Sequence, residues 1–252
     1  MYGAELTDVY ELIHQGRGKN YREEAEEVAR RVRARAPHAV SLLDVACGTG
    51  AHLRHFATLF DHVEGLEISE PMLAAAHDRM PGTTLHAGDM RTFAVNRAFD
   101  VITCMFGAIG YTTTQAELAA TLRRFARHLN PGGTVAVDPW WFAENYAEGH
   151  VSGDVVTVDG RTVARVSHSA REDGACRMEV HYIVADAVAG VRHFAESHRI
   201  SLFTRQQYQT AFAAAGFDVD YVAGLNAGRG LFIGSLRPPR RPVTAGHHVH
   251  EE

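Results

Sequence analysis

Two glycines one residue apart, Gly48 and Gly50, follow a run of apolar residues that contains Asp44. An apolar run of this length is typical of a buried parallel strand, and residues 51–60 behind it are predicted to be helical. The glycines permit positive φ angles and let a ligand approach the backbone closely. A dinucleotide-binding turn would have a third glycine where this chain has Leu53. The pattern favours a different nucleoside cofactor, with a merely glycine-rich turn as the alternative.

Further acidic residues are predicted at the ends of the next two strands. Glu67 stands 23 positions after Asp44, and Asp89 follows near the end of the third strand. Because the carboxyl ends of parallel strands meet at one edge of a sheet, these acids are expected to lie close together. A carboxylate at such a position can accept two hydrogen bonds from one ligand. An exposed acid at a strand end is the alternative for Glu67.

The elements that must position these residues alternate between strands and helices. After the strand that begins at Ser41, further strands are expected at residues 60–68, 83–90, 99–106, 134–138, 219–222 and 231–236. Helices are expected at 21–35, 51–60, 116–129 and 206–215, and after Ser69, which can cap a helix that contains Pro71 in its first turn. This alternation predicts an α/β fold with a mostly parallel sheet and a ligand site beyond the strand carboxyl ends.

The periodicity changes to two between residues 144 and 199. Strand-like segments are separated by the turn signals Asp159-Gly160 and Asp173-Gly174, which predicts an antiparallel meander. We therefore expect a core of residues 1–143 and 200–236, with residues 144–199 inserted for substrate binding and dimerisation. Residues 237–252 hold three prolines and three histidines and are expected to form a disordered tail.

Composition limits the classes of partner. The 252 residues carry a formal net charge of −5, which argues against nucleic acid as a substrate. No apolar run approaches the roughly 20 residues of a membrane span. Cys47, Cys104 and Cys176 are expected to be reduced and buried, and the first eleven residues include three acids, unlike a signal peptide. A cytoplasmic protein is expected.

Seven short motifs occur together and in order along the chain. They are residues 16–21 (GRGKNY), 42–50, 88–91 (GDMR), 139–142 (PWWF), 165–169 (RVSHS), 177–181 (RMEVH) and 228–232 (GRGLF). In this combination residues 1–236 resemble the dTDP-amino-sugar N,N-dimethyltransferases of macrolide and other antibiotic deoxysugar biosynthesis, which are class I methyltransferases dependent on S-adenosylmethionine (SAM). The resemblance implies a Rossmann-like fold with a seven-stranded sheet, SAM as cofactor and S-adenosylhomocysteine as product. It implies that Glu67 accepts hydrogen bonds from two ribose hydroxyls and that Asp89, with the backbone of Met90, binds the adenine edge. It also implies two methylations of the amine of a desosamine- or mycaminose-type dTDP sugar.

The cofactor site is expected to hold residues from the first turn and from the strand ends. These are Arg17, Tyr21, Asp44, Ala46, Cys47, Gly48, Glu67, Asp89, Met90 and Met105. Arg17 and Tyr21 are expected at the amino-acid end of SAM, because a carboxylate favours a cation and a phenol donor. A surface cation is the alternative for Arg17.

The substrate amine is expected near His14 and His181, with catalysis mainly by positioning, since well-oriented reactants gain roughly 7–11 kcal/mol. A packed or solvated histidine is the alternative for each. The expected substrate-binding residues are Tyr111, Trp140, Trp141, Ser167, Arg177 and Arg229, with no metal. Core packing is the alternative for the two tryptophans, and a surface position for Arg177.

Two other functions remain open at this point. One is methylation of a different small amine, as in a glycine-type N-methyltransferase, and the other is SAM binding without catalysis. A homodimer joined through the meander is also expected, because a small alternating sheet must bury one face. Neither nucleic acid nor a membrane is an expected partner.

Overall fold

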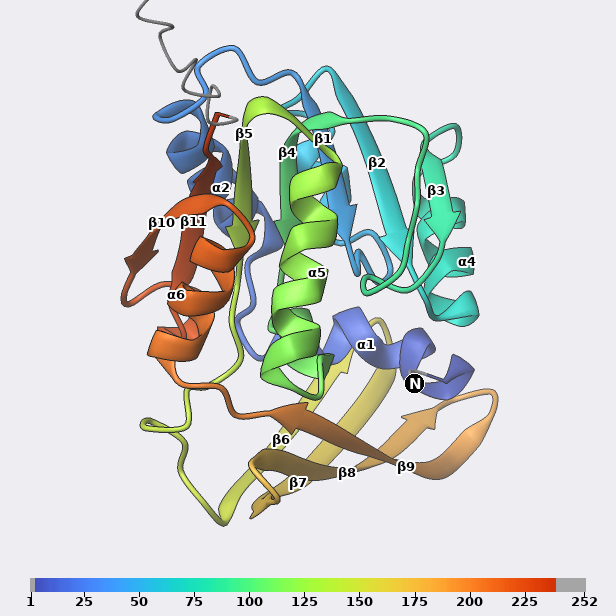
Figure 1. The fold of residues 1–252 in the computed structure, drawn as a ribbon. Coiled ribbons are helices and arrows are strands. Elements are labelled where there is room, and N and C mark those ends of the chain that lie inside the picture. Colours follow the sequence, from blue (N-terminus) through green and yellow to red (C-terminus); the bar gives the residue numbers. More distant parts are fainter. Residues whose placement is uncertain (1–2, 239–252) are drawn as a thin grey trace, which may run out of the picture.

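A computed structural model describes residues 3–238 of the chain and contains two separate sheets (Figure 1). The larger sheet has seven strands in the order β10-β11-β5-β4-β1-β2-β3. Its strands are β1 (Ser41–Val45), β2 (His62–Glu67), β3 (Thr84–Ala87), β4 (Phe99–Cys104), β5 (Leu129–Val137), β10 (Phe217–Val222) and β11 (Leu231–Leu236). Strands β1 to β5 pair in parallel, whereas β11 is antiparallel to both of its neighbours. The predicted mostly parallel, seven-stranded α/β fold is confirmed.

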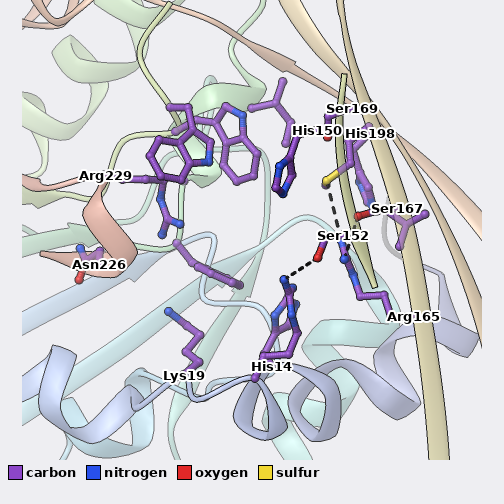
Figure 2. A pocket seen from close by; sticks show the side chains of 18 of the residues that line it. His14, Lys19, His150, Ser152, Arg165, Ser167, Ser169, His198, Asn226 and Arg229 are labelled. Atoms are coloured by element: carbon purple, nitrogen blue, oxygen red, sulfur yellow. Dashed lines mark hydrogen bonds between the residues drawn. The ribbon is translucent and has the colours of Figure 1, made fainter. Parts of the chain in front are cut away.

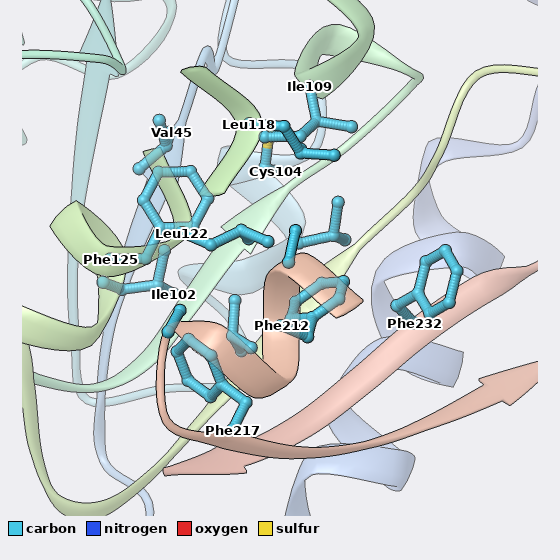
Figure 3. Packing of buried hydrophobic residues seen from close by; sticks show 14 of the residues in the cluster. Val45, Ile102, Cys104, Ile109, Leu118, Leu122, Phe125, Phe212, Phe217 and Phe232 are labelled. Atoms are coloured by element: carbon cyan, nitrogen blue, oxygen red, sulfur yellow. The ribbon is translucent and has the colours of Figure 1, made fainter. Parts of the chain in front are cut away.

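Helices cover both faces of this sheet. They are α2 (Tyr21–Arg33), α3 (Leu53–Phe56), α4 (Glu70–Arg79), α5 (Gln115–Arg127), α6 (Arg205–Ala214) and the short 3₁₀ segments η1 (Ala108–Tyr111) and η2 (Asn226–Gly228). Phe125 of α5 and Phe212 of α6 belong to one core cluster with Phe217 and Phe232 of the sheet (Figure 3). The helices α2 and α3 contribute to a second cluster with Leu42. Burial on both faces explains why β1 is a continuous apolar run.

Helix α3 is much shorter than the predicted helix over residues 51–60. Only Leu53–Phe56 is α-helical, and turns follow it. The Thr58 hydroxyl donates to the carbonyl of His55 at 2.8 Å, a side-chain bond that competes with regular helical pairing. The predicted cap of the next helix is confirmed, because the Ser69 hydroxyl accepts from the Met72 amide at 3.4 Å.

The smaller sheet is the predicted antiparallel meander. It consists of β6 (His150–Val158), β7 (Arg161–Glu172), β8 (Ala175–Asp186) and β9 (Gly190–Ser201), in that order. At both predicted two-residue turns the Asp and the Gly have positive φ, between 47° and 77°. That geometry matches the twist of a tight hairpin and fixes the register of β6, β7 and β8. The strands extend well beyond the predicted segments because polar residues alternate with apolar ones along their length.

Helix α1 (Ala4–Gly16) lies between the two sheets (Figure 1). Leu6, Val9 and Ile13 form one stripe of this helix and pack on Val163 and Val180 of the smaller sheet. No helix was expected over residues 1–18, although the spacing of these three residues fits a helical face. The packing gives the smaller sheet an inner face against α1 and an outer face exposed to solvent.

Three further expectations concern the chain as a whole. Among residues 3–238 no helix combines the length and the apolar character that crossing a membrane requires. Cys47, Cys104 and Cys176 are free and buried, as expected. Most of the expected tail, residues 239–252, lies outside the described residues.

Candidate active site

A cavity of about 340 Å³ opens where β1, β2 and β4 end. Nine of the ten residues expected at the cofactor line it. They are Tyr21, Asp44, Ala46, Cys47, Gly48, Glu67, Asp89, Met90 and Met105. Ala46 and Gly48 have φ angles of 57° and 58°, so the turn after β1 is in the left-handed region, which brings the backbone itself to the wall.

Glu67 is buried at this wall and holds the backbone around it. One carboxylate oxygen accepts from the Gly48 amide at 2.9 Å, and the other accepts from the amides of Ile68 and Ser69, both at 2.8 Å. A carboxylate offers about four lone-pair sites, so three are occupied. Glu67 therefore fixes the two turns that flank the cavity, in addition to any contact with ribose hydroxyls.

Asp44 lies deeper in the same cavity and is fully buried. The Thr103 hydroxyl donates to it at 2.7 Å. Burial raises the pKa of Asp44 to about 7, the Thr103 bond opposes that shift, and the nearby Glu67 adds to it. A carboxyl group in this state would be stabilised in its charged form by a cationic ligand.

The hydroxyl of Tyr21 is a buried polar atom without a hydrogen-bond partner among the described residues. It lines the cavity and is available to a polar group of a ligand, as the sequence analysis expected for the amino-acid end of SAM. Together with the acids and the exposed turn backbone, this donor set fits a cofactor that carries a sulfonium, an amino-acid end and a ribose. Arg17, expected beside Tyr21, lines a different cavity and pairs with Asp154 at 2.8 Å.

That second cavity is larger, about 670 Å³, and lies between the smaller sheet, α1 and the loops after β4 and β5. Figure 2 shows Arg165, Ser167 and Ser169 along one side of it, with Lys19 and Arg229 opposite. Six residues expected at the amine or the substrate line it, namely His14, Tyr111, Trp140, Trp141, Ser167 and Arg229.

The two cavities share part of their walls. Tyr10, Phe106, Tyr111 and His198 line both. The Tyr111 hydroxyl lies 3.0 Å from Nδ1 of His198, and Nε2 of the same ring lies 3.6 Å from a carboxylate oxygen of Glu196. Burial lowers the pKa of His198 to about 4, and the charge of Arg165 lowers it further. A neutral imidazole at neutral pH can accept a hydrogen bond from Tyr111, which orients that hydroxyl at the junction.

Phe106 has an unusual backbone at the same junction, with a φ of 59°. A left-handed conformation costs a non-glycine residue roughly 1–2 kcal/mol. The carboxylate of Asp138 accepts from the Phe106 amide at 3.0 Å and from Nη2 of Arg229, also at 3.0 Å. Both charged residues are buried, so the pair clamps the strained backbone. Arg229 was expected among the substrate-binding residues, and its guanidinium is already engaged with Asp138.

His14 lines the second cavity but is a very weak base there. Burial lowers its pKa to about 3, and four surrounding cations, first Arg17 and then Arg165, Lys19 and Arg229, lower it further. Its ring meets that of Phe106 edge-on, with the centroids 4.9 Å apart. The geometry favours a packing or hydrogen-bonding role over proton abstraction.

His181 and Arg177 do not line either cavity. Both lie on the outer face of β8, where His181 is 3.1 Å from Nε2 of His193 and the Nε of Arg177 is 3.1 Å from Glu172. The side chain of His181 is 47% exposed. Their alternation with the buried Val180 and Tyr182 sets this direction, so the structure does not bring these two expected site residues to the amine or to the substrate.

Among the residues of the second cavity that were not predicted from the sequence are His198 and Arg165, which was named only as part of a motif. The Asp173-Gly174 turn contains the signal that could have found Arg165. A two-residue hairpin turn pairs Glu172 with Ala175, which places Arg177 opposite Ala170 and therefore on the other face from Arg165. His198 similarly alternates with exposed residues in β9, on the face of the buried Phe194.

Comparisons with known proteins agree with this geometry. Residues 42–133 match the family described as a methyltransferase domain. The dTDP-3-amino-3,4,6-trideoxy-alpha-D-glucopyranose N,N-dimethyltransferase of Streptomyces venezuelae is 55% identical over 93% of this chain and 99% of its own length. The chain belongs to the family of dTDP-amino-sugar N,N-dimethyltransferases. It is a SAM-dependent N-methyltransferase, as the resemblance implied.

Other relatives of this family support the same assignment. The dTDP-3-amino-3,6-dideoxy-alpha-D-glucopyranose N,N-dimethyltransferase of Streptomyces fradiae is 54% identical over 92% of this chain and 91% of its own length. The crystal structure of Streptomyces venezuelae DesVI superposes with a TM-score of 0.90 at 54% identity, covering 93% of this chain and all of that one. The SAM-bound amino pentose methyltransferase CalS10 of Micromonospora echinaspora superposes with a TM-score of 0.84 at 51% identity, covering 90% and 96%. SAM is therefore the cofactor of this enzyme.

Proposed function

We propose that this N-methyltransferase methylates, twice, the 3-amino group of a dTDP-linked amino-deoxyhexose. The observation that carries the proposal is the shared wall of the two cavities, because an amine in the larger one would meet the methyl donor in the smaller one at Tyr111 and His198. Two relatives that are 54–55% identical are named for 3-amino sugars, which favours that position of the amine over the 4-position.

The residues at the junction would act mainly by orientation. SAM, when bound, supplies a methyl group on a sulfonium, which is already activated toward a neutral amine. The Tyr111 hydroxyl lies 3.0 Å from Nδ1 of His198, and its oxygen can accept an amine N–H while the hydroxyl donates to the imidazole, which would turn the nitrogen lone pair toward the cofactor cavity. Since the pKa of His198 is only about 4, this pair is a weak proton acceptor, and the amine proton would leave chiefly to solvent.

Product analysis tests the proposal directly. The enzyme is incubated with SAM and a panel of dTDP-3-amino and dTDP-4-amino sugars, with glycine and the free amino sugars as controls. The masses of the products are measured by mass spectrometry. We expect a gain of two methyl groups on the 3-amino nucleotide sugars. Turnover of glycine or another free amine at a comparable rate would indicate a different substrate class. SAM binding without turnover of any amine would indicate a non-catalytic protein.

The outer face of the smaller sheet supports a further part of the proposal, a homodimer joined through this sheet. Five large apolar side chains on it are exposed, namely Val151, Val155, Val166, Ile183 and Val191. An exposed apolar group of this kind marks an association surface in soluble proteins. Sedimentation at micromolar concentration should give about twice the mass of one chain, and Val166→Glu should give a single chain. A wild-type monomer with full activity would contradict this arrangement.

A cytoplasmic location, which the unpaired cysteines favour, remains part of the proposal.

A further inference from the structure

Arg165 is a buried cation with an incomplete set of partners. Its side chain lies in β7 on the inner face of the smaller sheet and only 5% of the residue is exposed. Nη1 donates to the Ser167 hydroxyl at 2.9 Å, and Nη2 approaches the sulfur of Met178 at 3.9 Å. Nε is buried and has no hydrogen-bond partner among residues 3–238. The ion pairs formed by those residues include none with Arg165.

The other cations around the same cavity are different. Each is held by a carboxylate, so their charges are already compensated. These pairs are Arg17 with Asp154 at 2.8 Å, Lys19 with Glu24 at 2.7 Å, and Arg229 with Asp138 at 3.0 Å. Asp154 stands directly opposite Arg165 in the sheet register, yet its carboxylate turns to Arg17. Because arginine stays charged in proteins and no carboxylate among residues 3–238 pairs with Arg165, an anionic ligand would compensate its buried charge.

Hydroxyl groups extend the same surface. Ser167 and Ser169 follow Arg165 at alternate positions of β7 and therefore share its face, and Ser152 of β6 lies opposite Ser167. All three serines line the cavity beside Arg165 (Figure 2). A planar guanidinium with neighbouring hydroxyl donors is the arrangement that recognises phosphate oxygens.

The distance from the junction suits a group attached to the same sugar. Met178, whose sulfur contacts the guanidinium, is paired in the sheet with His198 of the junction. Side chains of such cross-strand neighbours start about 5 Å apart, of the order of the width of a sugar ring. An amine held at Tyr111 and His198 would therefore place the diphosphate, which is attached two ring carbons away on the same sugar, beside Arg165.

We propose that Arg165, together with the Ser167 hydroxyl, binds the diphosphate of the nucleotide sugar and makes the enzyme select nucleotide-linked sugars over free amino sugars. This inference rests on the proposed function, and it assigns the phosphate contact to a residue other than Arg229 and Arg177. Arg229 is engaged with Asp138, and Arg177 lies on the opposite face of the sheet.

The test uses a variant that should weaken dTDP binding without lowering the stability of the folded protein. Arg165→Met removes the charge and keeps the length of the side chain. Because the charge is uncompensated in the free enzyme, the melting temperature without ligand should stay the same or rise. Affinity for dTDP, measured by calorimetry, should fall about 100-fold, as expected when one partner of a buried charge pair is truncated. Affinity for S-adenosylhomocysteine should change less than twofold.

Arg177→Met is the matched control, because it removes an arginine from the outer face of the adjacent strand. It should leave dTDP affinity unchanged within twofold. Arg165→Lys keeps the charge but loses the planar fork, so a loss of about tenfold is expected. In methylation assays Arg165→Met should lower kcat/KM for the nucleotide sugar, whereas Arg177→Met should leave it within twofold of wild type.

The outcomes separate this inference from the proposed function. Wild-type enzyme that binds dTDP, with Arg165→Met and Arg165→Lys both binding it within threefold of wild type, would overturn the role of Arg165 alone. Wild-type enzyme that neither binds dTDP nor methylates a dTDP-amino sugar would overturn both. If Arg165→Met does not fold, Arg165→Lys decides the question by the same dTDP titration.

Discussion

The two cavities are built from different parts of the backbone. The cofactor cavity uses the ends of parallel strands and the turns that leave them, so main-chain groups such as the Gly48 amide form much of its wall. The second cavity uses the inner face of an antiparallel sheet, and its wall is made of side chains from alternate positions. A turn exposes its main-chain groups to the cavity whichever side chains flank it. On a sheet, each side chain lies on one face or the other according to whether its position along the strand is odd or even.

The two cavities also differ in charge. The smaller cavity is lined by Asp44, Glu67, Asp89 and one cation, Arg91, whereas the larger is lined by three arginines, Lys19 and one acid, Glu24. An acidic wall suits a cationic sulfonium cofactor, and a basic wall suits an anionic nucleotide sugar. Phe106 lines both cavities and marks the boundary between them. The difference between the cavities can therefore be tested by substitutions in the cofactor cavity, in the second cavity and at this boundary.

The largest effect is expected on the cofactor side, from Glu67→Ala. The substitution removes a buried charge from the cavity and leaves three backbone amides without their acceptor. At about 1 kcal/mol for each lost bond, the melting temperature should fall by about 5–10 °C. SAM affinity, measured by calorimetry, should fall about 100-fold, since charge-assisted bonds contribute about 1.5–3 kcal/mol each.

Glu67→Gln serves as the control, because it keeps the shape and one oxygen acceptor. Its SAM affinity should lie between those of the wild type and Glu67→Ala, while dTDP affinity should be the same in all three proteins. Unchanged SAM affinity in Glu67→Ala would remove this residue from the cofactor site.

A smaller effect is expected at the boundary, from Arg229→Lys. A lysine cannot bridge both oxygens of Asp138, so the Phe106 amide and the left-handed turn lose part of their support. We expect kcat to fall about 30-fold, within the range for misplacement of reactants, with KM for the nucleotide sugar unchanged within threefold. A rise in KM at constant kcat would show instead that Arg229 contacts the phosphate.

The difference between the two cavities explains why the sequence predicts the residues of the cofactor cavity better than those of the second cavity. The residues of the cofactor cavity lie beside short motifs at strand ends, so their positions follow once the strands are placed, and nine of ten line the cavity. Arg17 was misplaced because its position depends on α1, a helix that the sequence analysis did not assign. His181 and Arg177 were misplaced because their motif was considered without the parity fixed by the Asp173-Gly174 turn.

The pair of Asp138 and Arg229 that holds the Phe106 backbone could not be predicted from the sequence either. The physical reason here is the separation of the two residues along the chain. Asp138 and Arg229 lie 91 positions apart, and only the antiparallel placement of β11 beside β5 brings them together. No local pattern reports the left-handed backbone of Phe106, which is stabilised by this long-range pair. Contacts of this kind require the tertiary structure.

A tenfold effect is expected from pH on the cofactor side. Burial raises the pKa of Asp44 to about 7, so the free enzyme binds a proton there that an unfolded chain would release near pH 4. The contribution of Asp44 to stability therefore falls as pH rises from 4 to 7. A bound cation favours the charged form and lowers this pKa, so SAM binding releases a proton. SAM affinity should fall by up to about tenfold for each pH unit below 7.

Asp44→Asn should abolish that pH dependence at the cost of some affinity at pH 8. dTDP affinity should not follow the same profile, because its cavity does not contain Asp44. A wild-type SAM affinity that is constant between pH 6 and 8 would mean that Asp44 is not the group that titrates.

Two histidines on opposite faces of the smaller sheet give the last comparison, and the smallest effect is expected for His181→Ala. His198→Ala removes the partner that orients the Tyr111 hydroxyl, and kcat should fall about tenfold or more. His181→Ala removes an exposed side chain from the outer face, where substitutions usually change free energies by less than about 0.5 kcal/mol. Its kcat/KM should therefore stay within about twofold of wild type. Because the outer face is also the proposed dimer surface, sedimentation of both variants must accompany the kinetics. A large loss of kcat in a His181→Ala protein whose mass in solution matches the wild type would break the assignment of the active site to the inner face.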